Sequence, residues 1–220
     1  MNWKRARTGE QKEQRIAEIL EATARLYENG PFEAITLAAI AKESRFTRSN
    51  LYKYFRTKED IFFEFLKHDL RLWRADVIGA FQDEASCAVD RFADIWVAVQ
   101  RRHRRMMSLV SILYSHLEKR ASIENLIDFK RMANDEFGML SDLICRLFPV
   151  LSSGDALRFL QLQLAAAIGL TTMTTLSETQ HKVLEMPDFQ HFKIDYEAGL
   201  RETVAHLLQG MQDRAKSTPG

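Results

Sequence analysis

Proline and glycine are scarce in this 220-residue sequence, which contains 4 and 9 of them respectively. A turn-rich β architecture needs more of both, so their scarcity favours helices. Leucine, alanine, isoleucine, glutamate, lysine and arginine are common instead, and 46% of the residues are hydrophobic, which is enough to bury a core. We therefore predict an all-α protein of about nine helices.

Cysteine is nearly absent as well. Cys87 and Cys145 are too far apart for a zinc site and too few for a disulfide scaffold, and the histidines show no metal-ligand spacing. The basic N-terminal residues precede no apolar run, so we expect no secretory signal. Residues 162–176 contain Gln163 and four threonines, which predicts a buried helix rather than a membrane span. These features favour a cytoplasmic protein without metal or cofactor.

The formal net charge is only +1, and its distribution is more informative than its size. Residues 1–60 contain 12 Lys and Arg against 9 Asp and Glu, whereas residues 61–220 contain 19 against 21. The excess positive charge therefore lies in the first part of the chain, where we look for contacts with nucleic acid.

Helical periodicity in this basic part predicts three helices. The first covers about 10–29, the second 37–44 with Thr36 as its N-cap, and the third 48–55 with Thr47 as its N-cap. Two short helices joined by a turn, after a longer helix, are the pattern of a helix-turn-helix.

The third of these helices has two different faces. Leu51 and Phe55 are four residues apart and are expected to point into a small core with Ile19 and Ile40. The opposite face carries arginine, serine, asparagine, tyrosine and lysine. Arginine and asparagine can pair with base edges, while tyrosine, lysine and serine reach phosphate oxygens, so this face is suited to DNA.

The same residues carry a family resemblance. The segments "ITLAAIA" (35–41), "FTRSNLYKYF" (46–55) and "TKEDI" (57–61) resemble the N-terminal domain of the TetR family of transcriptional repressors, over about residues 11–66. The resemblance implies a DNA-binding domain over 1–56 and an effector-binding and dimerisation domain over 57–220. It also implies a homodimer that binds a palindromic operator and leaves it when a small-molecule effector enters the second domain.

Position by position, the resemblance assigns two kinds of DNA contact. The phosphate contacts are Thr36, Thr47, Tyr52, Tyr54 and Lys58, and the residues that face the groove are Arg48, Ser49, Asn50 and Lys53.

Two features depart from the family pattern. Arg45 stands where members usually have glycine, which predicts a slightly different turn. Ala38 and Ala39 replace long polar residues, so sequence reading is expected to come mostly from helix 48–55. The basic N-terminal segment 1–9, with Lys4, Arg5 and Arg7, is either a solubilising tail or an arm that enters the minor groove.

Beyond residue 57, further helices are expected from 58 into the low 80s and at 87–101, 103–119, 122–148, 153–180 and 190–213. The last two carry apolar stripes that suit a four-helix dimer interface or, alternatively, packing within one subunit. The interface candidates are Leu164, Ile168, Leu200, Val204, Leu207 and Met211.

Bulky residues of the middle helices are either core or the lining of the effector pocket that the resemblance implies. The pocket candidates are Trp96, His103, Met107, Tyr114, Phe129, Met132, Phe159 and Gln163.

The sequence thus favours a ligand-responsive regulator of transcription that binds double-stranded DNA, which the resemblance implies to be a repressor, and no catalytic constellation suggests an enzyme. The alternatives are an all-α ligand-binding protein or enzyme with a structural front domain, and a protein-interaction module. The effector, the operator, the regulated genes and the choice between repression and activation are not encoded in any pattern that we recognise.

Overall fold

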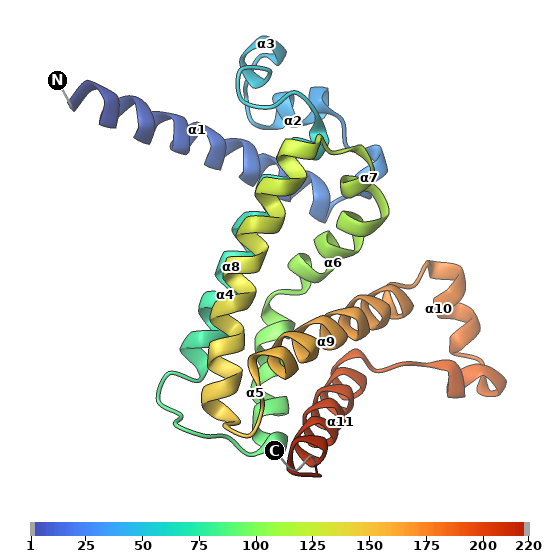
Figure 1. Ribbon diagram of the computed structural model, residues 1–220. Coiled ribbons are helices and arrows are strands. Elements are labelled where there is room, and N and C mark those ends of the chain that lie inside the picture. The colour runs from blue at the N-terminus through green and yellow to red at the C-terminus, as the bar shows by residue number, and fades with distance from the viewer. Residues whose placement is uncertain (1–2, 218–220) are drawn as a thin grey trace. The chain divides into compact units, whose positions relative to one another are not determined.

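The computed structural model describes the backbone of residues 3–217 and the side chains of residues 9–217. Over these residues the chain is helical and has no β-strand (Figure 1), which confirms the predicted all-α class. The chain forms two compact units. Unit one contains Met1–His68 and Ile112–Phe129, and unit two contains Asp69–Ser111 and Lys130–Gly220. Neither unit is therefore a single continuous stretch of sequence.

Unit one begins with the long helix α1 (Trp3–Glu28) and the 3-10 turn η1 (Phe32–Ala34). These are followed by α2 (Leu37–Glu43), α3 (Arg48–Leu51) and the first part of α4 (Lys58–Ala80). The later stretch adds the π-turn η2 (Leu113–Leu117), α7 (Glu118–Arg120) and the first turns of α8 (Ile123–Leu147).

Aromatic rings fill the centre of unit one. Phe62 of α4 meets Tyr27 and Phe32 edge-on, with ring centroids 5.5 and 4.9 Å apart. Phe63, on the next position of α4, lies 5.5 Å from Phe129 of α8. Edge-to-face pairs of this kind stabilise a core beyond the burial of their area. The two stretches of sequence that form unit one are therefore joined through α4.

Unit two contains the rest of α4 and α8, together with five further helical elements. These are α5 (Val89–Arg102), α6 (Arg104–Ile112), α9 (Ser153–Thr174), α10 (Glu178–Leu184) and α11 (Tyr196–Ser217), with the 3-10 turn η3 (Pro187–Phe192) before the last. The helix α11 packs against both α5 and α9. Trp96 of α5 lies at the centre, 5.6 Å from Trp73 and 5.6 Å from Phe159 between ring centroids.

Several helix boundaries differ from the sequence prediction. The first helix begins at Trp3 rather than near residue 10, so the backbone of the basic segment belongs to α1. The side chains of Lys4, Arg5 and Arg7 lie outside the described residues. The third helix ends at Leu51, although the amide of Phe55 still bonds the carbonyl of Leu51 at 3.0 Å, so the chain continues as a helical turn.

The predicted helix 153–180 is in fact two helices. The hydroxyls of Thr174 and Thr175 bond carbonyls of the preceding turn, at 2.8 and 2.7 Å, which competes with continuation of the helix. Ser177 then caps α10 and forms a capping box with Gln180. The helix expected from residue 190 begins at Tyr196, where Asp195 accepts a hydrogen bond from the amide of Ala198 at 2.9 Å.

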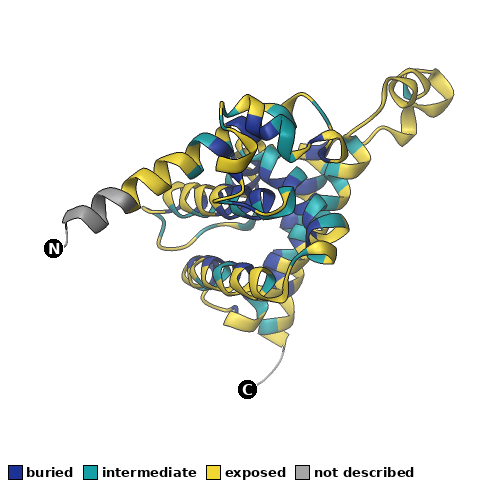
Figure 2. Cartoon of the chain, turned by 90° about the horizontal axis from the view of Figure 1, so that it is seen from above, coloured by how far each residue is buried: buried dark blue, intermediate teal, exposed yellow. Residues whose placement is uncertain are grey.

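The helix α9 is long and apolar enough to cross a membrane by length and composition, and 28% of its apolar window is buried within the protein. One such helix does not indicate a membrane protein. It packs on α11 and buries Gln163 completely. In contrast, α10 and η3 contain no buried residue, and both are exposed in Figure 2.

Candidate nucleic-acid interface

The turn between α2 and α3 is held by local hydrogen bonds. Thr36 and Thr47 cap the two helices, and each hydroxyl accepts from a backbone amide three residues later at 3.2 Å. The amide of Phe46 bonds the carbonyl of Ala41 at 2.8 Å. Capping fixes where each short helix starts, which a four-residue helix cannot do through its own hydrogen bonds alone.

Arg45 lies in this turn with a φ of 60°, the left-handed conformation that favours glycine. The sequence predicted a slightly different turn because Arg45 replaces glycine. The backbone nevertheless adopts the left-handed conformation at this position, which is strained for an arginine. The family pattern of a glycine here is explained by the same backbone geometry.

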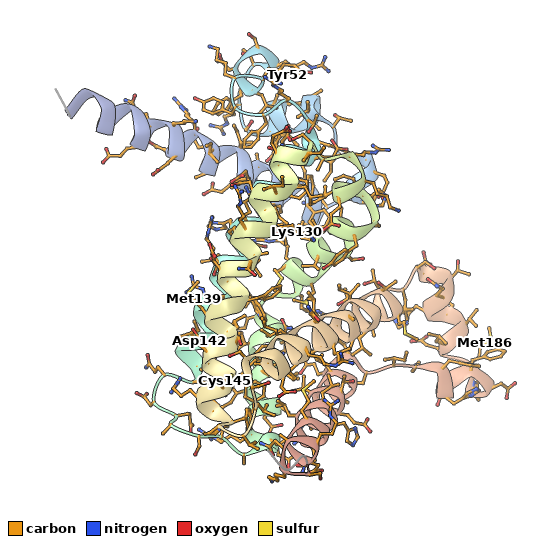
Figure 3. All side chains as sticks on the ribbon, viewed as in Figure 1. Tyr52, Lys130, Met139, Asp142, Cys145 and Met186 are labelled. Carbon is orange, nitrogen blue, oxygen red and sulfur yellow. The ribbon has the colours of Figure 1, made fainter. Side chains whose placement is uncertain are left out.

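The two faces of α3 are those predicted. Leu51 and Phe55 are buried, as are Ile19 and Ile40, which fixes the orientation of the helix. The outer face exposes the residues predicted to face the groove, Arg48, Ser49, Asn50 and Lys53. Tyr52 is also exposed and points away from its unit in Figure 3. Thr36 and Thr47 are exposed at the two helix starts, while Tyr54 is half-buried with its ring 6.2 Å from that of Phe46.

A shallow groove of about 280 Å³ runs beside α3. Its lining combines three cations with an amide and two aromatic rings: Arg15, Arg45, Phe46, Asn50, Lys53 and Tyr54. The exposed ammonium of Lys53 donates to Asn50 Oδ1 at 3.0 Å, so the two side chains lie side by side at this groove. Arg15 and Arg45 were not among the predicted contact residues. Arg15 could be found only from the structure, because α1 brings it to α3 from far away in sequence.

Arg15 is itself positioned by its neighbours. Its guanidinium donates to Glu18 at 2.8 Å and lies 5.5 Å from the centre of the Phe46 ring. The hydrogen bond to Glu18 raises the pKa of Arg15. An arginine side chain is charged at any physiological pH, so Arg15 presents a cation at the edge of the groove.

Lys58, a predicted phosphate contact, has hydrogen-bond partners within the protein itself. Its ammonium donates to the carbonyls of Phe32 at 2.8 Å, Ile35 at 3.0 Å and Glu33 at 3.5 Å, and lies 4.1 Å from the centre of the Phe32 ring. An ammonium has three hydrogens, and these carbonyls can accept all of them. Lys58 therefore ties α4 to η1, directly before α2.

Comparison with known families gives a match for each part of the chain. Residues 19–65 match the model described as bacterial regulatory proteins of the tetR family, and residues 67–215 match a tetracyclin repressor-like C-terminal domain. The chain belongs to the TetR family of transcriptional regulators. It is accordingly a DNA-binding protein that regulates transcription, and α2 with α3 is its helix-turn-helix.

Individual relatives show how the similarity is distributed. An uncharacterised HTH-type transcriptional regulator, YfiR of Bacillus subtilis (strain 168), is 40% identical over 55 residues, which cover 25% of this chain and 27% of that protein. The match thus spans about a quarter of the curated relative. The solved structure of the fatty acid degradation regulator FadR from Bacillus halodurans covers 88% of this chain and 98% of its own, with a TM-score of 0.59 and 13% identity, so it shows a shared fold.

The residues predicted for the TetR effector pocket fall into both units. Trp96, Phe159 and Gln163 lie together in unit two, and the indole nitrogen of Trp96 donates to Gln163 Oε1 at 3.2 Å. Met107 is buried in unit two, where His103 lies 2.9 Å from Asp76 and Met132 is partly exposed. Tyr114 and Phe129 belong to unit one, the first exposed and the second packed on Phe63.

The residues predicted for the TetR dimer interface also separate into two groups. Leu200, Val204 and Met211 are buried within the single chain, where α11 packs on α5 and α9. Because these three side chains are covered within the single chain, their burial favours the alternative of packing inside one subunit. Leu164, Ile168 and Leu207 are partly exposed and stay candidates for the interface.

Proposed function

We propose that this TetR family member is a cytoplasmic repressor that binds an inverted-repeat operator as a homodimer and releases it when a small-molecule effector binds unit two. The observation that carries the proposal is the exposed polar face of α3 above a fixed apolar face. Reading two half-sites one turn of DNA apart, about 34–36 Å, requires two recognition helices and hence two subunits. Regulation by binding requires no catalytic step.

In this proposal the residues of the helix-turn-helix have two roles. Arg48, Ser49, Asn50 and Lys53 read base edges, and Thr36, Thr47, Tyr52 and Tyr54 contact phosphates, with Arg15 and Arg45 added at the adjacent groove. DNA binding is assigned to residues 1–56, and effector binding and dimerisation to residues 57–220. A functional boundary of this kind need not coincide with the compact units.

The effector is proposed to act by population shift. It would favour a dimer in which the two recognition helices no longer match successive major grooves. The aromatic core of unit two supports an effector with an apolar body. FadR is a regulator of fatty acid degradation, and fatty acids likewise have an apolar body.

Selection of bound fragments from random DNA would test the first part. We expect an inverted repeat, and in a mobility-shift assay Arg48→Ala and Asn50→Ala should each weaken binding to it by about 1–3 kcal/mol while changing the preference at one position per half-site. Arg131→Ala, an exposed arginine of α8, is the matched control.

Equal weakening on the selected repeat and on random DNA would contradict the role of Arg48 and Asn50 in base reading. A protein that is monomeric at working concentration, with no preference for an inverted repeat, would contradict the proposed function as a whole.

A further inference from the structure

The aromatic core of unit two contains neutral polar groups. Gln100 of α5 and Gln163 of α9 are both completely buried. Gln163 Oε1 accepts from the indole of Trp96 at 3.2 Å and from Gln100 Nε2 at 3.4 Å, and its own amide donates to the carbonyl of Leu160 at 3.2 Å. Gln163 is thus satisfied at both ends, and it orients Gln100.

Three buried side-chain atoms among the described residues have no hydrogen-bond partner: Gln100 Oε1, an acceptor, Trp73 Nε1, a donor, and the hydroxyl of Tyr196. The first two belong to residues near Trp96. Trp73 meets Trp96 edge-on at 5.6 Å, and Gln100 follows Trp96 by one helical turn on α5. A buried polar group without a partner destabilises the fold, so an unpaired acceptor and an unpaired donor in one core call for a reason.

The buried charges of unit two limit the charge of any ligand that could pair with Gln100 and Trp73. Its buried charged residues among those described are Asp69 and Glu136. Arg105 binds Asp69 with two hydrogen bonds of 2.8 Å, and Arg74 donates to Glu136 at 2.6 Å. Both buried charges are therefore negative and already neutralised, and an anion brought into this core would meet no buried cation among the described residues.

We infer that Trp73 and Gln100 bind the uncharged polar group of the effector, a hydroxyl or a primary amide at one end of an apolar molecule. The inference rests on the proposed function, since it names the chemistry of the effector. A hydroxyl donates its proton to Gln100 Oε1 and accepts from the indole of Trp73. A carboxylate accepts from Trp73 but has no proton for Gln100, so it is rejected.

Three probes with one apolar tail separate these cases: 1-octanol, octanamide and octanoate at about pH 7.5, where the acid is ionised. Binding to the full-length protein is followed by tryptophan emission and by calorimetry. We expect the dissociation constants of the alcohol and the amide to be at least about tenfold lower than that of the carboxylate. Equal affinity for all three, or tighter binding of octanoate, would overturn the inference.

Two substitutions locate the contact. Gln100→Met removes the acceptor at similar volume, and Trp73→Phe removes the donor while it keeps an aromatic ring. Each should raise the dissociation constant of 1-octanol by about tenfold, whereas Gln161→Met, on the exposed side of α9, should leave it unchanged. The probe preference of the unsubstituted protein decides the matter if a variant does not fold.

Bound water is the competing explanation for the two unpaired atoms. In that case none of the probes binds, and Gln100→Met changes only the melting temperature, which would refute the inference. Operator binding is measured separately. If the protein binds its selected DNA but no probe, the inference fails and DNA binding stands. If 1-octanol binds at Gln100 without releasing DNA, the site stands and ligand responsiveness fails.

Discussion

The helices α3 and α9 each present an amide side chain, in opposite surroundings. Asn50 on α3 is exposed and accepts a hydrogen bond from exposed Lys53. Gln163 on α9 is completely buried and bonds both Trp96 and the backbone of Leu160. Water can replace the partners of the first amide but not of the second. The same chemical group is thus proposed to serve recognition in one unit, whereas it holds the core together in the other.

The sharpest test of this contrast is truncation of both amides. Gln163→Ala leaves the indole of Trp96 without its acceptor and opens a cavity, so it should lower the free energy of unfolding by about 3 kcal/mol in urea denaturation. Asn50→Ala should change it by less than about 0.5 kcal/mol. Similar losses in the two variants would contradict the contrast.

Two lysines of unit one provide a second, smaller test. Lys58→Met removes three hydrogen bonds to η1 and should cost about 1–3 kcal/mol of stability, because bonds from a charged donor to carbonyls are lost. Lys53→Met should leave stability unchanged within about 0.5 kcal/mol but reduce by about one the slope of log binding constant against log salt concentration. If Lys58→Met lowered that slope as much as Lys53→Met, Lys58 would be a phosphate contact after all.

The smallest expected effect concerns the turn between α2 and α3. Arg45→Gly should raise the free energy of unfolding by about 0.5–1 kcal/mol, because glycine adopts a positive φ without strain. Ser44→Gly, one residue earlier at a φ of −80°, should have the opposite sign. Thermal denaturation of the two variants gives the comparison, and a loss of stability in both would mean that the Arg45 side chain contributes more than its backbone strain costs.

The sequence predicted the helix-turn-helix well because its signals are local. Thr36 and Thr47 were recognised as caps from their positions directly before the two predicted short helices, and the four-residue spacing of Leu51 and Phe55 identified the buried face of α3. Both features are in the structure. Ser177 and Gln180 carried an equally local capping signal, which the continuous apolar pattern around them obscured.

Long-range contacts were not predictable in the same way. Lys58 points to carbonyls of residues more than 20 positions earlier, and nothing in its own neighbourhood indicates this. The periodicity of α11 showed that Leu200, Val204 and Met211 share a face, but not whether this chain or a second copy covers it. The roles assigned to individual DNA-contact and effector residues remain predictions.

Unit one consists of two separate stretches of sequence, which affects any attempt to transfer its DNA-binding part to another protein. A fragment that stops after His68 would lack the stretch Ile112–Phe129. It would leave Phe63 without Phe129, and Phe32 without the ring of His116, whose imidazole also lies 3.1 Å from Glu33. Swapping DNA specificity between relatives is therefore safest by exchanging the outer face of α3 alone, with both supporting stretches kept from the same parent.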